Sequence, residues 1–300
     1  MRAQVLVALL GASCVCQGVA FREVVREKNY VVEFGERSLE VDPNDGARIL
    51  AFSLGGRSVL IPRPESPEAF GSSFWPSPQR DWQWPPPLEL DRKPWQVTAA
   101  GPSLELASET VPKLGISAVQ RLTPDETHGS VTIEYRVTNR DVAPRGVAPW
   151  QNTRVRPRGL TFFPASEPAL PQSSLVLAPE AGVIWFLHDP TAITKDSKLW
   201  ADGHEGWMAQ VDGDLLFVKV FDDVPREAQA PTEAEIVIYV AGGGLFVEME
   251  NQGPYETLAP GASSTWTVRW VLRRLPPDVR AEPGNPKLLG LARELAASVR

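Results

Sequence analysis

The chain contains only two cysteines, and both lie close to its N-terminus. Cys14 and Cys16 belong to an apolar stretch that follows Arg2 and ends in small residues at Ala20. This pattern is typical of a secretory signal that is removed after Ala20. A chain that begins at residue 21 has no thiol, which excludes disulfide bonds and thiolate zinc sites.

The apolar stretch also bears on where the protein resides. It falls short of the roughly 20 apolar residues that a membrane-spanning helix needs, so a cleaved signal is the favoured interpretation over an anchor. We expect a periplasmic or extracellular protein. One alternative stays open, because residues 9–14 resemble a bacterial lipoprotein motif with the leucine displaced by one position, which would attach a lipid to Cys14.

The sequence is also poor in histidine and in positive charge. It has three histidines and 30 basic against 37 acidic residues, a formal net charge of −7. This balance argues against nucleic-acid and anionic-lipid partners. Neither a phosphate-binding glycine loop nor a serine nucleophile motif is present, and we expect no cofactor and no transition metal. Calcium stays open, because oxygen ligands leave a faint signature; candidate ligands are Asp196, Asp202, Glu205, Asp222 and Asp223.

Tryptophan is the residue type that the chain has in excess. It has ten tryptophans, compared with four tyrosines and eleven phenylalanines. Indole rings pack against the apolar faces of sugar rings while their N–H groups donate hydrogen bonds, so this composition favours a saccharide ligand. The alternative is that most of the tryptophans belong to the core.

Short alternating or β-branched runs, separated by turn residues, predict strands throughout the chain. Residues 38–41 and 47–54 flank a Pro-Asn-Asp-Gly turn and predict a hairpin. Residues 131–138 alternate apolar and polar side chains, as a half-buried strand does. Residues 206–211 and 215–221 enclose an Asp-Gly hairpin turn. We expect further strands at 235–240, 245–250 and 263–272.

Helical periodicity is convincing only near the C-terminus. Asn285 can cap, and Pro286 can open, a helix with an apolar stripe that packs outside a sheet. We therefore predict a signal at 1–20, one all-β domain at 21–280 and a helical segment at 281–300. Residues 62–94 are rich in proline, which cannot donate ladder hydrogen bonds, so we expect a long stiff loop there.

Three segments carry candidate binding chemistry. In 75–84, Trp82 and Trp84 would share one face of an extended segment, with Arg80 beside them. Residues 200–207 place an imidazole, two carboxylates and two indoles close together. In 248–255, Glu248 and Glu250 would project from one side of a strand, as paired carboxylates do for acid–base chemistry. The sequence does not fix which of the two glutamates faces a cleft.

These segments, in this order, resemble the galactose-mutarotase-like superfamily. The similarity lies in 134–140 with 147–152, and in 248–252 followed by 258–270. The loop at 75–87 and the segment 200–207 look most like the family called domain of unknown function 4380. The resemblance implies one large antiparallel β-supersandwich with a sugar cleft on its concave face.

The resemblance also implies roles for individual residues. Where the epimerases of the superfamily carry an acid histidine, this chain has Trp150, Gln151 and Asn152, which cannot protonate a ring oxygen. We expect a monomeric saccharide-binding protein; an epimerase-like enzyme with Glu250 as base and His204 as acid is the alternative, and a structural envelope module is a third. The predicted ligand-binding residues are Arg80, Trp82, Trp84, Arg154, Trp207 and Gln252.

Overall fold

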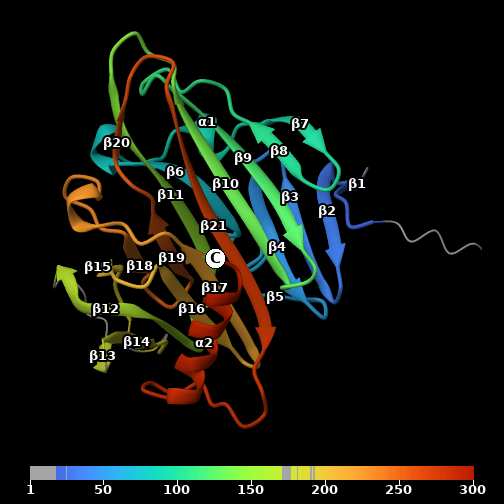
Figure 1. Cartoon of the computed structure of the whole chain (residues 1–300), viewed down its shortest axis with the longest axis vertical. Helices are drawn as coiled ribbons and strands as arrows, with labels where there is room; N and C mark the ends of the chain where they lie inside the picture. The colour runs from blue at the N-terminus through green and yellow to red at the C-terminus, as the bar shows by residue number, and fades with distance from the viewer. Residues whose placement is uncertain (1–17, 25, 171–176, 181, 190, 192) are drawn as a thin grey trace, which may run out of the picture.

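The protein is a two-layer antiparallel β-sandwich (Figure 1). The computed structural model describes residues 18–24, 26–170, 177–180, 182–189, 191 and 193–300. Most of the predicted signal, including Cys14, lies outside the described residues. In pairing order the first layer consists of β1 (Arg22–Val24), β2 (Asn29–Phe34), β3 (Arg37–Asp42), β4 (Arg48–Leu54), β6 (Ser72–Ser77), β11 (Arg145–Val155), β19 (Val247–Gln252), β18 (Ile236–Val240) and β15 (Ser197–Gly203).

The second layer is also antiparallel throughout. Strand β12 (Leu160–Leu170) joins the two layers, because its first residues pair with β16 and its later ones with β15. In pairing order the second layer consists of β7 (Gln96–Ala100), β8 (Leu104–Ala107), β9 (Ile116–Asp125), β10 (Ser130–Asn139), β21 (Ser263–Arg274), β17 (Leu215–Phe221) and β16 (Trp207–Asp212), followed by β12, β14 (Val183–Leu187) and β13 (Leu177–Glu180). The short elements are β5 (Arg57–Ser58), β20 (Glu256–Leu258), the 3-10 turns η1 (Gln79–Asp81) and η2 (Arg226–Ala228), and the helices α1 (Leu88–Asp91) and α2 (Pro286–Ser298).

The main core lies between the two layers. Phe52 of β4 contacts Phe217 of β17 and Trp270 of β21, with ring centroids 6.1 and 5.9 Å apart. Along β10, Val131 and Ile133 are buried in this core, whereas Glu134 between its apolar neighbours is exposed. The predicted alternation of this strand is therefore confirmed.

The predicted hairpins and the C-terminal helix are also confirmed. β3 pairs with β4, and β16 with β17, around the expected turns. The Asn285 Oδ1 accepts hydrogen bonds from the backbone N–H groups of Lys287 and Leu288 at 3.0 and 3.2 Å, so it caps α2. Helix α2 buries Leu288 and Ala292 in a second apolar cluster on the outer side of β16 and β17 (Figure 1). Within the described ranges, no helix is long and apolar enough to cross a membrane.

The prediction of an uninterrupted loop over residues 62–94 was wrong. Residues 72–77 form β6, whose six residues are all buried and which pairs along its length with β11. The strand tolerates its proline because Pro76 lies opposite Pro149, so neither position requires a ladder donor from the other. This strand connects the proline-rich region directly to the site described below.

Candidate functional site

The strand register brings a set of polar and aromatic side chains together on one side of the first layer. Arg154 of β11 lies opposite Glu248 of β19, which lies opposite Tyr239 of β18, which lies opposite Lys198 of β15. Directly opposed residues project from the same side of a sheet. Two residues further along these strands, the next row consists of Asn152, Glu250, Val237 and Trp200. We call this set the polar face; it consists of Trp150, Asn152, Arg154, Lys198, Trp200, Tyr239, Glu248, Glu250 and Gln252.

Arg154 and Glu248 form a buried ion pair at the centre of the polar face. The Arg154 Nε donates to Glu248 Oε1 at 3.0 Å, and the two side chains are only 5% and 10% exposed. The same guanidinium donates through Nη1 to Ser73 Oγ at 3.0 Å and lies 5.2 Å from the centroid of the Trp75 ring. Bonds in several directions fix this arginine, as a buried charge requires.

Glu250 lies beside this pair and is fully buried. Its Oε2 accepts a hydrogen bond from Trp150 Nε1 at 3.0 Å, whereas its Oε1 has no donor among the described residues. Burial raises the pKa of Glu250 well above its ordinary value; Lys198 opposes this shift, and the adjacent Glu248 carboxyl increases it. Two neighbouring carboxyls cannot both ionise easily, so burial and the adjacent Glu248, which pairs with Arg154, favour the protonated form of Glu250.

Asn152 lies directly opposite Glu250 on the neighbouring strand. Its side chain is fully buried, and neither the amide nitrogen nor the amide oxygen has a partner among the described residues. A buried amide without partners costs free energy, so such a group usually serves a water molecule or a ligand. The polar face therefore holds a donor and an acceptor that its own side chains do not use.

Tryptophans pack along one edge of the polar face. Trp75, Trp82 and Trp150 are all buried, and their ring centroids lie 5.4 to 6.3 Å apart. Trp84 packs edge-on against Trp75 at 6.0 Å and is 70% exposed. The Lys198 Nζ lies 5.2 Å from the Trp150 ring centroid and 4.4 Å from that of Trp200.

The prediction that Trp82 and Trp84 share one face was wrong. The segment is not extended, because η1 precedes Trp82 and Gln83 adopts a left-handed conformation with φ of 63°. The chain therefore turns between the two indoles. Trp82 is 5% exposed within the aromatic cluster, whereas Trp84 remains at the surface.

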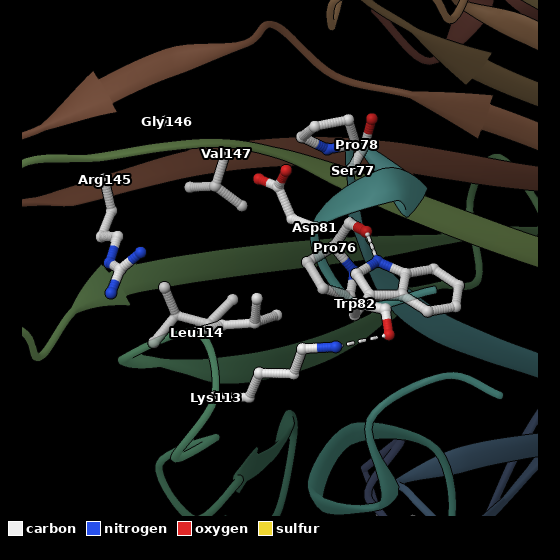
Figure 2. Close-up of a pocket in the computed structure, with 11 residues that line it drawn as sticks. Pro76, Ser77, Pro78, Asp81, Trp82, Lys113, Leu114, Arg145, Gly146 and Val147 are labelled. Atoms are coloured by element: carbon white, nitrogen blue, oxygen red, sulfur yellow. Dashed lines mark hydrogen bonds between the residues drawn. The ribbon is translucent and has the colours of Figure 1, made fainter. Parts of the chain in front are cut away.

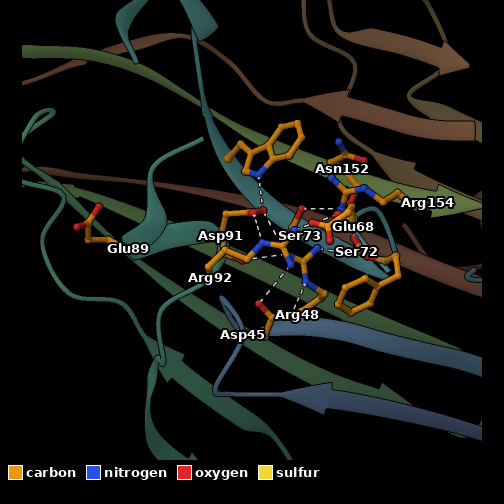
Figure 3. A network of polar contacts seen from close by, with 12 residues as sticks. Asp45, Arg48, Glu68, Ser72, Ser73, Glu89, Asp91, Arg92, Asn152 and Arg154 are labelled. Carbon is orange, nitrogen blue, oxygen red and sulfur yellow. Dashed lines mark hydrogen bonds and ion pairs between the residues drawn. The ribbon is translucent and has the colours of Figure 1, made fainter. Parts of the chain in front are cut away.

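A buried ionic network links Trp75 to Arg48 of β4 through Asp91. Figure 3 shows Arg48 and Asp91 at its centre. The Trp75 Nε1 donates to Asp91 Oδ1 at 2.8 Å, and Arg48 Nη2 donates to the backbone oxygen of Asp91, also at 2.8 Å. Burial alone would raise the pKa of Asp91, but the guanidinium groups of Arg48 and Arg154 lower it below its usual value. Burial lowers the pKa of Arg48 to about 10. Asp91 thus remains ionised and holds the indole in place.

Gln252 and Arg80 lie at the end of the face nearest η1. Gln252 Oε1 accepts a hydrogen bond from Ser77 Oγ at 2.9 Å, and its Nε2 donates to Glu233 Oε2 at 2.8 Å. Arg80 belongs to η1, and its exposed guanidinium Nε lies 3.7 Å from Asp81 Oδ1. Gln252 is therefore held by two internal hydrogen bonds, whereas Arg80 lies exposed at the surface beside Asp81.

His204 and Trp207 lie elsewhere. His204 is exposed after β15, where its Nε2 lies 3.1 Å from the backbone oxygen of Gly182, and it lines a separate hollow with Asp223 and Arg269. Trp207 is buried in the cluster beneath α2. The structure therefore does not bring these two residues to Glu250, although it brings Arg154, Glu250 and Gln252 together and adds Trp82 and Trp84 beside them.

Sequence reasoning did not select Lys198 or Tyr239, and it singled out Trp200 only as a member of its segment. The signal that could have found them is the alternation of β15, which places Lys198 and Trp200 on one side. Within the described ranges, no group of three or more histidine, cysteine or acidic side chains is arranged to hold a metal ion. The acidic residues considered for calcium therefore form no such group.

The fold is that of galactose-mutarotase-like proteins. A galactose mutarotase related enzyme from Lactobacillus acidophilus superposes with a TM-score of 0.59 at 10% identity, covering 84% of this chain and 99% of that one. A galactose mutarotase-like protein from Lactobacillus casei gives 0.56 at 10% identity, with coverages of 82% and 100%. A similar protein from Clostridium acetobutylicum gives 0.56 at 9% identity, with coverages of 85% and 98%.

At these identities the likeness shows the architecture alone. No protein with a curated description matched the chain. One family model does match, over residues 30–273, and its description is "Domain of unknown function (DUF4380)". That range contains every residue of the polar face and nearly all of both layers, with β1 outside it, and the chain therefore belongs to the DUF4380 family.

Proposed function

We propose that the protein is an exported carbohydrate-binding protein that holds a saccharide against the polar face. The observation that carries this proposal is the unpartnered amide of Asn152, which lies opposite Glu250 beneath a partly exposed aromatic rim. A sugar offers hydroxyls that donate and accept as well as apolar ring faces, so it matches an amide flanked by indoles.

The rim supplies the accessible contacts. Trp84 is exposed, whereas Trp200, Tyr239 and Lys198 are partly exposed above the buried residues. An indole can pack on a sugar ring, and the phenol and the ammonium can hydrogen-bond its hydroxyls. Arg154 and Glu248 hold each other in place, so the polar groups below the rim are preorganised and lose little conformational entropy on binding.

One observation favours a second function, the interconversion of sugar anomers on the same face. Burial and the adjacent Glu248 favour the protonated form of Glu250, while Glu248 Oε1 accepts a hydrogen bond from Arg154 Nε at 3.0 Å, and adjacent carboxyls in such different surroundings can supply an acid and a base. His204 is not needed in this scheme. Changing Glu250 to Gln would abolish interconversion while leaving binding in place if the protein is an enzyme.

Binding can be tested by removing the rim without disturbing the core. The variants Trp84→Ala and Trp200→Ala should each weaken saccharide affinity by about tenfold, since stacking on one aromatic ring contributes about 1 kcal/mol or more. Leu245→Ala is the matched control, because Leu245 is 64% exposed and lies outside the polar face. Equal affinities in all three variants would contradict a saccharide site at this rim, and a parent protein that binds no saccharide would favour a structural module.

The proposal that the protein is exported depends on residues 1–20, which have the pattern of a secretory signal. A fusion of residues 1–20 to a reporter enzyme that is active only outside the cytoplasm should give activity, and N-terminal sequencing of the exported protein should begin at Phe21. A protein that retains lipid at Cys14 would instead partition with the membrane fraction, and an inactive fusion would contradict export.

A further inference from the structure

A hollow of about 310 Å³ lies at the end of the sandwich where β6 and β11 meet η1 (Figure 2). One wall is the indole of Trp82, and Leu114 and Val147 form apolar walls around it. The Trp82 Nε1 donates to the backbone oxygen of Pro76 at 2.7 Å, so the ring is held in one orientation. The hollow is large enough for a small molecule with a ring of its own.

Charged side chains of both signs surround this apolar wall. The Lys113 Nζ donates to the backbone oxygen of Trp82 at 2.9 Å and has two further protons to offer. Arg145 bonds to Asp141 through Nε at 3.0 Å and lines the opposite end of the hollow. Figure 2 shows the Asp81 carboxylate directed toward Val147, across from Lys113.

This mixture of charges constrains the ligand. A cationic ligand would meet Lys113 and Arg145, and an anionic one would meet Asp81, so an uncharged molecule suits the hollow best. That molecule must accept hydrogen bonds from the two cations, donate one to the carboxylate and present an apolar face to the indole. A pyranose ring has all three properties, because its hydroxyls surround two faces made of C–H groups.

The hollow is distinct from the polar face, although the two share a wall. Trp82 faces the hollow on one side and packs against Trp150 and Trp75 on the other, at 6.3 and 6.0 Å. Trp150 in turn bonds to Glu250. None of the residues that line the hollow belongs to the polar face.

From this geometry we propose that the hollow beside Trp82 is a second carbohydrate site, which binds one uncharged sugar unit through Asp81, Lys113 and Arg145. The inference shares its ligand class with the proposed function but uses none of the residues assigned there. The protein would then contact two sugar units, one on each side of the aromatic cluster.

Calorimetric titration of residues 21–300 with methyl glycosides of glucose, galactose and mannose tests this inference. Methyl glycosides have a fixed anomeric centre, so turnover cannot obscure binding. The variant Asp81→Asn with Lys113→Met should lose at least about tenfold in affinity at one site, because hydrogen bonds to charged groups are lost. The control is Asp278→Asn with Lys287→Met, which removes an exposed ion pair beside α2.

The outcomes separate the two sites. The inference is supported if the double variant Asp81→Asn, Lys113→Met loses one site and the double variant Trp84→Ala, Trp200→Ala loses the other. Loss of all binding in the Trp84 and Trp200 variant alone overturns the second site and leaves the proposed function intact. Loss in the Asp81 and Lys113 variant alone retains the second site and contradicts the placement of sugar on the polar face. A parent protein that binds none of the glycosides overturns the second site.

Discussion

Trp150 Nε1 and Glu250 Oε2 are joined by a buried hydrogen bond of 3.0 Å, which links the aromatic cluster to the carboxyl pair. The bond occupies Glu250 Oε2, whereas Oε1 has no hydrogen-bond partner among the described residues.

Replacing Trp150 with Phe should lower the free energy of unfolding by about 1–3 kcal/mol, because Glu250 would lose its donor while remaining buried. Urea unfolding followed by circular dichroism measures the change. Trp84→Phe is the control, because the exposed Trp84 should tolerate the change within about 0.5 kcal/mol. A Trp150→Phe protein as stable as its parent would show that the bond contributes nothing.

Replacing Arg154 with Met should be more damaging, by about 3–5 kcal/mol, because Glu248 would become a buried charge without its partner. Adding Glu248→Gln should recover part of the loss, since a neutral amide costs less to bury. The same unfolding experiment applies to the single and double variants. If the loss of stability in the double variant equals the sum of the losses in Arg154→Met and in Glu248→Gln, the two side chains are not energetically coupled.

His188 should make stability depend on pH. Burial lowers its pKa from 6.5 to about 3, and its Nδ1 has no partner among the described residues. In the unfolded chain the His188 imidazole binds a proton below pH 6.5, whereas in the folded chain it does so only below about pH 3. Acidification between these two values therefore lowers the free energy of unfolding, by roughly 1.4 kcal/mol per pH unit. In urea unfolding between pH 7 and 4, the parent should lose stability faster than His188→Gln. Parallel losses would rule out this histidine as the cause.

Much of the architecture could be predicted because it depends on local pattern. The alternation in β10 and the Asn285 cap of α2 are each set by neighbours in sequence. Strand β6 escaped prediction because its partner is β11, far along the chain, and only that pairing places Pro76 where no ladder donor is needed. Proline content is a local signal, whereas tolerance of proline depends on the partner strand.

The candidate site was predicted only in part for the same reason. Alternation alone places Glu248 and Glu250 on one side of β19, and the structure confirms that they share it. Their neighbours Arg154 and Lys198 arrive from other strands, so register decides the contacts. His204 is near several chemical groups in sequence, yet its loop directs it toward a separate hollow.

Titration with sugars is the most direct test of whether the polar face holds a saccharide. Residues 21–300 are titrated with aldoses, uronic acids and oligosaccharides, and binding is followed by calorimetry and by tryptophan fluorescence. The same titrations are repeated with a double variant that carries Trp84→Ala and Trp200→Ala. We expect saturable heat and a change in tryptophan emission for at least one saccharide, and we expect both to be lost in the double variant. No saturable heat across the panel, or equal binding by the parent and the double variant, would contradict it.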